Sequence, residues 1–320
     1  MPILDMPLAK LKTYKGMNPR PKDFDAYWSR AIREMRSVDP KVKMTANQTV
    51  RVSYADCFDL NWTGVGGARI HAKLVRTKKI AQPRPALLVF HGYSMSSGDW
   101  SQKLAYAAEG FTVAALDCRG QGGSSEDRGG VGGTTLRGHI IRGLDGKPDN
   151  LLFRQIFLDA AQMAEIVMGL PGVDQNRVGA IGSSQGGGLT LACAALEPRI
   201  KRIAPCHPFL SDFKRVWDMD LDKDAYDELR YYFRSFDPLH KREKEIFTKL
   251  GYIDVQHLAP RIKAETLMAI TLQDSICPPS TQFAAYNKIK AKKKMALYFD
   301  YAHEQLRDWD DTTFQFMMGL

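Results

Sequence analysis

Short apolar segments that alternate with longer amphipathic ones constrain the fold of this chain more than any other feature of its sequence. The apolar segments are continuous, which is typical of strands buried on both faces of a parallel sheet. We expect strands over the ranges 68–76, 85–92, 111–117, 177–182, 202–208, 266–274 and 295–303. Helical patterns lie between them, at 100–110, 153–170 and 187–197. The sequence therefore predicts an α/β protein with a mostly parallel twisted sheet and helices on both faces.

Two ranges interrupt this alternation. Residues 121–149 are rich in glycine and too long for a plain connector, so we interpret them as a functional or interface loop. Residues 209–260 are polar and aromatic with a mostly helical pattern, which predicts a helical insertion before the last strands. An N-terminal arm carries a further helical pattern at 23–35. Since no internal repeat is present, we expect residues 1–320 to form a single domain.

Composition narrows the protein class. The N-terminus lacks the apolar block of a signal peptide, and no segment has the roughly 18 consecutive apolar residues of a membrane span. The five cysteines are far apart and form no C-x-x-C pair, which favours reduced thiols over disulfides or a zinc site. We therefore expect a cytoplasmic protein without a membrane partner.

The net charge of +9 does not by itself indicate a nucleic-acid partner, because the basic residues are scattered. The one basic run is KIKAKKK at 288–294. We interpret it as the end of a helix that begins near Ser280, where the helix dipole favours cations. A phosphate-binding patch would be larger and interleaved with aromatic residues, so no nucleic-acid partner is expected.

The segment VGAIGSSQGGGLT, residues 178–190, contains the pattern G-x-S-x-G at positions 182–186. It follows a predicted strand and precedes a predicted helix, which is the context of a nucleophile elbow. Glycines flank the serine because the strained turn leaves no room for Cβ atoms. Ser184 is at the centre of the pattern and is the candidate nucleophile. We expect Ser183, at the variable position, to face the interior.

The other members of a catalytic triad should follow in the order acid, then histidine, each just after a strand. Asp274 ends the apolar run TLMAITLQD, and His303 follows MALYFDYA. A serine hydroxyl needs a base to take its proton, and the base needs a carboxylate to orient it. The sequence therefore predicts Ser184, Asp274 and His303 as the triad.

No other histidine follows Asp274 except His303. His207 ends the strand after the elbow, and the sequence leaves open whether it approaches the pocket. The remaining histidines are interpreted as structural or surface residues, apart from His91: they are His71, His139, His240 and His257.

An oxyanion formed during acyl transfer needs backbone donors. The N–H of Gln185, directly after the nucleophile, is one candidate. The second should come from the loop after an early strand, and in VFHGY at 89–93 we choose the N–H of Tyr93. His91 in this turn is interpreted as a packed residue that shapes the loop rather than as a catalytic one.

Taken together, these residues make the chain similar to the acetyl xylan esterase and cephalosporin C deacetylase family, carbohydrate esterase family seven, of the α/β-hydrolase fold. The signatures present are Arg119-Gly120-Gln121, Gly182 to Gly187 in the order GSSQGG, and His303-Glu304. Segments such as HGYSMSSGDW, HIIRGLD, PFLSDFKRVWD and CPPSTQFAAYN extend the resemblance over nearly the whole chain.

The resemblance implies a serine esterase that deacetylates small esters, including acetylated xylooligosaccharides and cephalosporin C. It implies the triad and the oxyanion donors assigned above. It also implies an intracellular homohexamer, a trimer of dimers, with 121–149 as the interface loop. Arg119 is interpreted as a structural residue that ties this loop down.

Neither a metal nor an organic cofactor is expected for this chemistry, because no cluster with metal-ligand spacing is recognised in the sequence. Other activities on the same fold remain alternatives: a broader short-chain carboxylesterase, a longer-chain lipase or a peptidase. A non-catalytic binding protein is disfavoured, since such a protein would be expected to have lost part of the triad.

Overall fold

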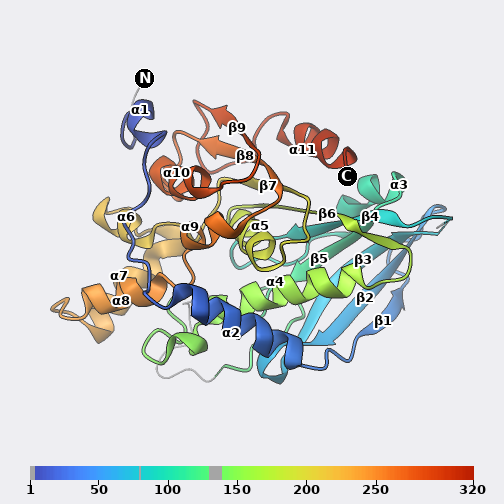
Figure 1. Ribbon diagram of the computed structural model, residues 1–320, viewed down its shortest axis with the longest axis horizontal. Coiled ribbons are helices and arrows are strands. Elements are labelled where there is room, and N and C mark those ends of the chain that lie inside the picture. Colours follow the sequence, from blue (N-terminus) through green and yellow to red (C-terminus); the bar gives the residue numbers. More distant parts are fainter. Residues whose placement is uncertain (1–3, 79–80, 130–138) are drawn as a thin grey trace.

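The computed structural model describes residues 4–78, 81–129 and 139–320 (Figure 1). Within these residues the core is a nine-stranded sheet with the order β1-β2-β3-β5-β4-β6-β7-β8-β9. The strands are β1 (Lys43–Asn47), β2 (Ala55–Thr63), β3 (Arg69–Thr77), β4 (Arg84–Phe90), β5 (Thr112–Asp117), β6 (Val173–Ser183), β7 (Arg202–Cys206), β8 (Glu265–Thr271) and β9 (Lys293–Tyr298).

The strands from β5 to β9 pair in parallel, while β1, β2 and β3 extend one edge of the sheet in antiparallel register. The carboxyl ends of the parallel strands therefore meet along one edge, where loops from distant parts of the sequence lie side by side. This architecture is the α/β-hydrolase fold, as the sequence predicted.

Helices cover both faces of the sheet. They are α1 (Leu8–Leu11), α2 (Phe24–Ser37), α3 (Leu104–Ala108), α4 (Leu152–Met168), α5 (Gln185–Leu196), α6 (Phe213–Asp218), α7 (Asp227–Phe236), α8 (Glu243–Leu250), α9 (Val255–Leu258), α10 (Pro279–Lys288) and α11 (Trp309–Met318). Short 3-10 helices are η1 (Val65–Gly67), η2 (Trp100–Lys103), η3 (Pro148–Asn150), η4 (Asp224–Tyr226) and η5 (Ala259–Arg261). In Figure 1, α2 and α4 lie on one side of the sheet, and α3 and α11 lie on the other.

The parallel strands β4, β5, β7 and β8 are mostly apolar because both of their faces are buried. In β4, Leu88 packs into the large cluster formed with α2, α4 and α5. Leu87, the residue before it, packs on the opposite face of the sheet, in the second cluster together with Trp309 of α11. Both leucines are fully buried, so neither face of the strand tolerates a polar side chain.

The helical insertion expected at 209–260 is present between β7 and β8, where it forms α6 to α9. The glycine-rich segment expected at 121–149 starts soon after β5, and its residues 130–138 lie outside the described residues. Arg119, directly before this segment, donates bidentate hydrogen bonds to Asp159 of α4 over 2.6 and 2.7 Å. Both side chains are buried, as expected if Arg119 anchors the start of the loop.

Three details differ from the expectations. Strands β1 and β2 were not predicted, because β1 is mostly exposed and β2 is only half-buried. The basic run 288–294 does not end a helix: α10 stops at Lys288, and Lys293 already belongs to β9. Ser183 does not face the interior but is exposed.

Among the residues that the structure describes, no helix is both long and apolar enough to cross a bilayer.

Candidate active site

The turn between β6 and α5 holds Ser184 in a strained conformation. Its backbone has φ 56° and ψ −119°, a region that residues with a Cβ rarely adopt. The turn places the serine between the end of a strand and the first residue of a 12-residue helix. Strain of this kind persists only where the surroundings enforce it, and it is concentrated at functional positions.

The flanking glycines make this turn possible because the backbone segments around it nearly touch. A Cβ at Gly182 would lie 2.4 Å from the carbonyl oxygen of Gly186. A Cβ at Gly186 would lie 2.1 Å from the carbonyl oxygen of Phe90, at the end of β4. Both separations are shorter than any real contact of a Cβ atom, so the positions require glycine as the motif predicted.

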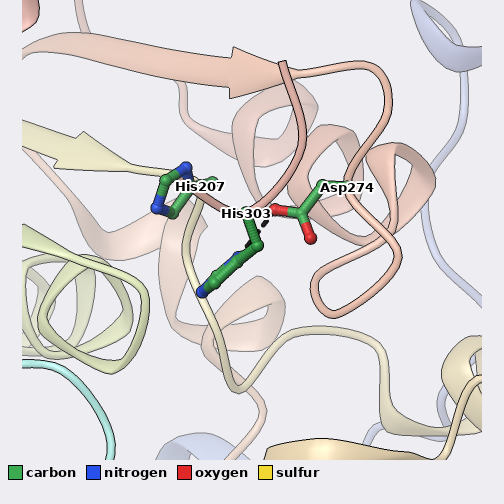
Figure 2. Close-up of side chains that lie close together, drawn as sticks. All are labelled: His207, Asp274 and His303. Atoms are coloured by element: carbon green, nitrogen blue, oxygen red, sulfur yellow. Dashed lines mark hydrogen bonds and ion pairs between the residues drawn. The ribbon is translucent and has the colours of Figure 1, made fainter. Parts of the chain in front are cut away.

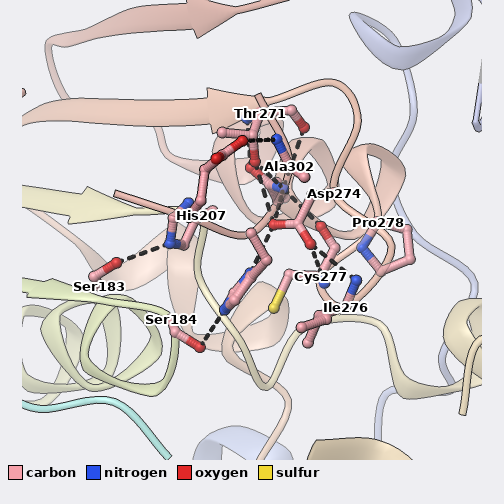
Figure 3. Close-up of polar contacts among 12 residues, drawn as sticks. Ser183, Ser184, His207, Thr271, Asp274, Ile276, Cys277, Pro278 and Ala302 are labelled. Atoms are coloured by element: carbon pink, nitrogen blue, oxygen red, sulfur yellow. Dashed lines mark hydrogen bonds and ion pairs between the residues drawn. The ribbon is translucent and has the colours of Figure 1, made fainter. Parts of the chain in front are cut away.

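The structure brings Ser184, His303 and Asp274 into one hydrogen-bonded chain (Figure 3). The Nδ1 atom of His303 lies 2.8 Å from Oδ2 of Asp274, and its Nε2 lies 2.9 Å from Oγ of Ser184. A carboxylate can only accept, so Nδ1 carries the proton and Nε2 is left to accept the serine hydroxyl. This is the tautomer that a general base for Ser184 requires.

The carboxylate of Asp274 is fully buried, and both of its oxygens have donors. Oδ1 accepts the backbone N–H groups of Ile276 and Cys277 at 2.9 and 2.8 Å. Oδ2 accepts the hydroxyl of Thr271 at 3.2 Å in addition to His303. These donors hold the carboxylate in one orientation, so the imidazole it contacts is held in one orientation too.

His207, whose position the sequence left open, lies directly beside the triad. The centroids of its ring and of the His303 ring are 4.4 Å apart, and its Nε2 is 2.8 Å from Oγ of Ser183. Burial, together with the neighbouring His303, lowers the pKa of His207 to about 4. His207 is therefore neutral at physiological pH and adds no positive charge next to the base.

His207, Asp274 and His303 are also residue types that bind metal ions, and their side chains gather in Figure 2. The atoms that would coordinate an ion already have other partners. Both nitrogens of His303 are used by Asp274 and Ser184, and Nε2 of His207 is used by Ser183. The arrangement fits a hydrogen-bonded triad better than a set of metal ligands.

The loop after β4, which carries Tyr93, is held by His91. Nε2 of His91 accepts the backbone N–H of Cys118 at 3.0 Å, so its Nδ1 carries the proton and donates to the carbonyl of Gly92 at 2.7 Å. Burial lowers the pKa of His91, which keeps it neutral and in this role. His91 thus shapes the turn, as the sequence analysis favoured.

Gln121 links the two candidate oxyanion segments, a role the sequence analysis did not assign. Its Oε1 accepts the backbone N–H of Ser94 at 2.9 Å and the side-chain amide of Gln185 at 3.0 Å. Its Nε2 donates to Oε1 of Gln185 at 2.9 Å. The residue after Tyr93 and the residue after Ser184 are therefore tied to the same side chain. Its place in the Arg119-Gly120-Gln121 signature was the available signal.

Neither candidate oxyanion donor has another partner within the described ranges. The backbone N–H groups of Tyr93 and Gln185 donate no hydrogen bond to any described residue. Since Gly186 packs against the end of β4, the two segments that carry these groups are close neighbours. The arrangement leaves two donors free next to the hydroxyl of Ser184, which suits the stabilisation of a developing oxyanion.

Comparisons with known proteins identify the family of the chain. The model of the family described as acetyl xylan esterase (AXE1) matches residues 1–320. A curated relative, the acetyl esterase Axe7A of Xylanibacter ruminicola, is 26% identical over 285 residues. That match covers 88% of this chain but 63% of the relative, so the chain spans less than two thirds of the curated relative's length.

Two solved structures resemble the chain over nearly its full length. Acetyl xylan esterase 1 from Thermoanaerobacterium sp. JW/SL YS485 is 60% identical, with a TM-score of 0.96, and the match covers 98% of this chain and 99% of that one. An acetyl xylan esterase from Paenibacillus sp. R4 is 36% identical, with a TM-score of 0.93 and the same two coverages.

Proposed function

The chain belongs to the acetyl xylan esterase family, and from this premise we propose that it is a serine esterase that removes acetyl groups from small acetylated molecules. One observation carries the proposal. The serine at the strained elbow, the histidine and the buried carboxylate form a continuous hydrogen-bonded chain, with the half-buried Ser184 at one end.

In the first half of the reaction, His303 takes the proton of the Ser184 hydroxyl as the oxygen attacks the acetyl carbonyl. Asp274 holds the imidazole and stabilises its charged form. The backbone N–H groups of Tyr93 and Gln185 stabilise the negative oxygen of the tetrahedral intermediate. The C–O bond to the alcohol then breaks, the alcohol leaves with the proton from His303, and acetyl-Ser184 remains.

In the second half, a water molecule gives its proton to His303 and attacks acetyl-Ser184. The same oxyanion donors stabilise the second tetrahedral intermediate. Collapse of this intermediate breaks the bond to Ser184, returns the proton to the serine oxygen and releases acetate. The five polar groups named above and water suffice for both halves.

We propose acetylated xylooligosaccharides as the substrate class, with cephalosporin C as a second acetyl ester that the enzyme accepts. The names of the two full-length structural relatives, both acetyl xylan esterases, support the first assignment. The cephalosporin assignment is supported by the sequence resemblance alone.

Acetate release tests the proposal. The substrates are acetylated xylooligosaccharide, cephalosporin C, p-nitrophenyl acetate and p-nitrophenyl octanoate, with the Ser184→Ala variant as the blank. Turnover of the acetyl esters with little turnover of octanoate is expected. Strong octanoate turnover would contradict the acetyl specificity, and equal activity of the blank would contradict the mechanism.

We further propose a cytoplasmic location and assembly into a homohexamer, a trimer of dimers, in which the glycine-rich segment 121–149 contributes to the interface. The five cysteines, all buried and unpaired, support a reducing compartment. We also propose that residues 1–320 fold as a single domain. Light scattering measures the mass of the assembly, and deletion of part of 122–133 should reduce that mass; an unchanged mass would contradict the role of the loop.

A further inference from the structure

The carboxylate of Glu228 lies at a junction of three segments that are far apart in the sequence. Glu228 is in the first turn of α7, within the helical insertion, and it is 2% exposed. Its Oε1 accepts the hydroxyl of Tyr93, in the loop after β4. Its Oε2 accepts the backbone N–H groups of Ile140 and Ile141 at 2.8 and 3.0 Å, near the end of the glycine-rich segment.

The side chain of Tyr93 connects this junction to the candidate oxyanion site. Its ring packs edge-on against Phe209, with centroids 5.5 Å apart, and against His139, with centroids 4.9 Å apart. The backbone N–H of Phe209 in turn donates to the carbonyl of Ser184 at 2.9 Å. The neighbours of Tyr93 in the loop are held by His91 and Gln121, and the bond to Glu228 fixes the hydroxyl end of the tyrosine side chain.

Burial of the Glu228 carboxylate carries an energetic cost, which its three donors offset only in part. Burial raises the pKa of Glu228 to about 7, although three donors face it. None of the ion pairs between described residues includes Glu228. An apolar side chain of similar volume would leave the Tyr93 hydroxyl and the two backbone N–H groups without this acceptor, so the acceptor itself is needed.

We propose that Glu228 is a positioning residue of the reaction: through the hydroxyl of Tyr93 it holds the backbone N–H of Tyr93 in the direction of the oxyanion. This carboxylate then couples the helical insertion to the oxyanion site, beside the link that Gln121 provides from the glycine-rich segment. The inference rests on the proposed function, because it requires the Tyr93 N–H to stabilise an oxyanion.

The expected effect is on turnover rather than on substrate binding. An oxyanion donor acts in the transition state, so its displacement should lower kcat and leave KM nearly unchanged. Complete loss of one such donor typically costs about 10²–10³ in kcat, and a displaced donor should cost less, about 10-fold.

The test compares four variants in the hydrolysis of p-nitrophenyl acetate. Tyr93→Phe removes the donor hydroxyl, and Glu228→Leu removes the acceptor. Glu228→Gln keeps an acceptor for the backbone N–H groups and can donate its amide to the tyrosine oxygen. Tyr232→Phe is the matched control, since Tyr232 also joins α7 to the glycine-rich segment, through Asp145, without touching the loop of Tyr93.

The proposal predicts that Tyr93→Phe and Glu228→Leu each lower kcat about 10-fold with little change in KM, and that the double variant is no slower than the slower single variant. Glu228→Gln and Tyr232→Phe should keep most of the wild-type kcat. Thermal melting reports the folded fraction of each variant, and Tyr93→Phe still tests the proposal if Glu228→Leu does not fold.

Wild-type kcat in folded Tyr93→Phe and Glu228→Leu would overturn the inference, as would an equal loss in Tyr232→Phe. Failure of the proposed function would be seen separately. In that case the wild-type protein would release no acetate, or the Ser184→Ala blank would release as much acetate as the wild-type protein.

Discussion

Adding one methyl group at Gly186 should slow the proposed reaction about 100-fold without removing any catalytic side chain. The Cβ of an alanine there would lie 2.1 Å from the carbonyl oxygen of Phe90, and real Cβ atoms do not approach closer than 3.0 Å. The loop after β4 and the start of α5 must therefore separate by about 0.9 Å. These two segments carry the Tyr93 and Gln185 donors.

A misplacement of about 1 Å at a reacting centre costs about 10² in rate, or about 2.7 kcal/mol of activation free energy. The assay is kcat/KM for p-nitrophenyl acetate, with thermal melting to confirm that Gly186→Ala is folded. Gly169→Ala, at the end of α4, is the control, because its nearest neighbour would lie at an ordinary 3.4 Å. A folded Gly186→Ala variant with wild-type kcat/KM would refute the reasoning.

Two further predictions concern stability, measured by urea unfolding. Arg119→Ala should lower the free energy of unfolding by about 3–5 kcal/mol, because it leaves the buried Asp159 without its partner. Arg36→Ala, which breaks an exposed ion pair with the same helix, should cost less than about 1 kcal/mol; equal losses would contradict the argument. Burial lowers the pKa of His257 from 6.5 to about 3, so below pH 6.5 the unfolded chain binds a proton that the folded chain does not. Stability should therefore fall as the pH drops, by about 2 kcal/mol at pH 5, and His257→Gln should flatten this limb; an unchanged slope would contradict it.

The parallel strands could be predicted because burial on both faces leaves an unmistakable pattern. Residues 112–117 of β5 are all buried, and the four between Thr112 and Asp117 are apolar. In β2 only part of the residues are buried, so polar and apolar residues mix and no continuous run marks the strand. Local pattern therefore identified β3 to β9 and missed the two outer antiparallel strands, β1 and β2.

The end of α10 was misplaced for a related reason. Lysines are compatible with a helix end and equally with the start of a half-exposed strand. The run 288–294 contains the last residue of α10 and the first residues of β9. Only the pairing of β9 with β8 decides between them, and that pairing is a tertiary contact.

The candidate site, too, could be predicted only in part from local sequence patterns. Ser184, Asp274 and His303 each follow a parallel strand, and such strand ends meet at one edge, so their proximity could be expected from the order of the elements. Gln121 and Glu228 contribute through contacts with segments at least 27 positions away. No local pattern marks Glu228, and the Arg119-Gly120-Gln121 signature points to Gln121 without giving its contacts, so the roles of both residues were found only in the structure.

The measurement that tests the central claim most directly is acetate release from p-nitrophenyl acetate by Ser184→Ala and Ser183→Ala, side by side. The two serines are adjacent, and each lies within hydrogen-bond distance of a histidine. If Ser184 is the nucleophile, its replacement should lower kcat by about 10⁶, and Ser183→Ala should stay within a few-fold of the wild-type enzyme. Comparable losses in both variants, or a larger loss in Ser183→Ala, would contradict the account.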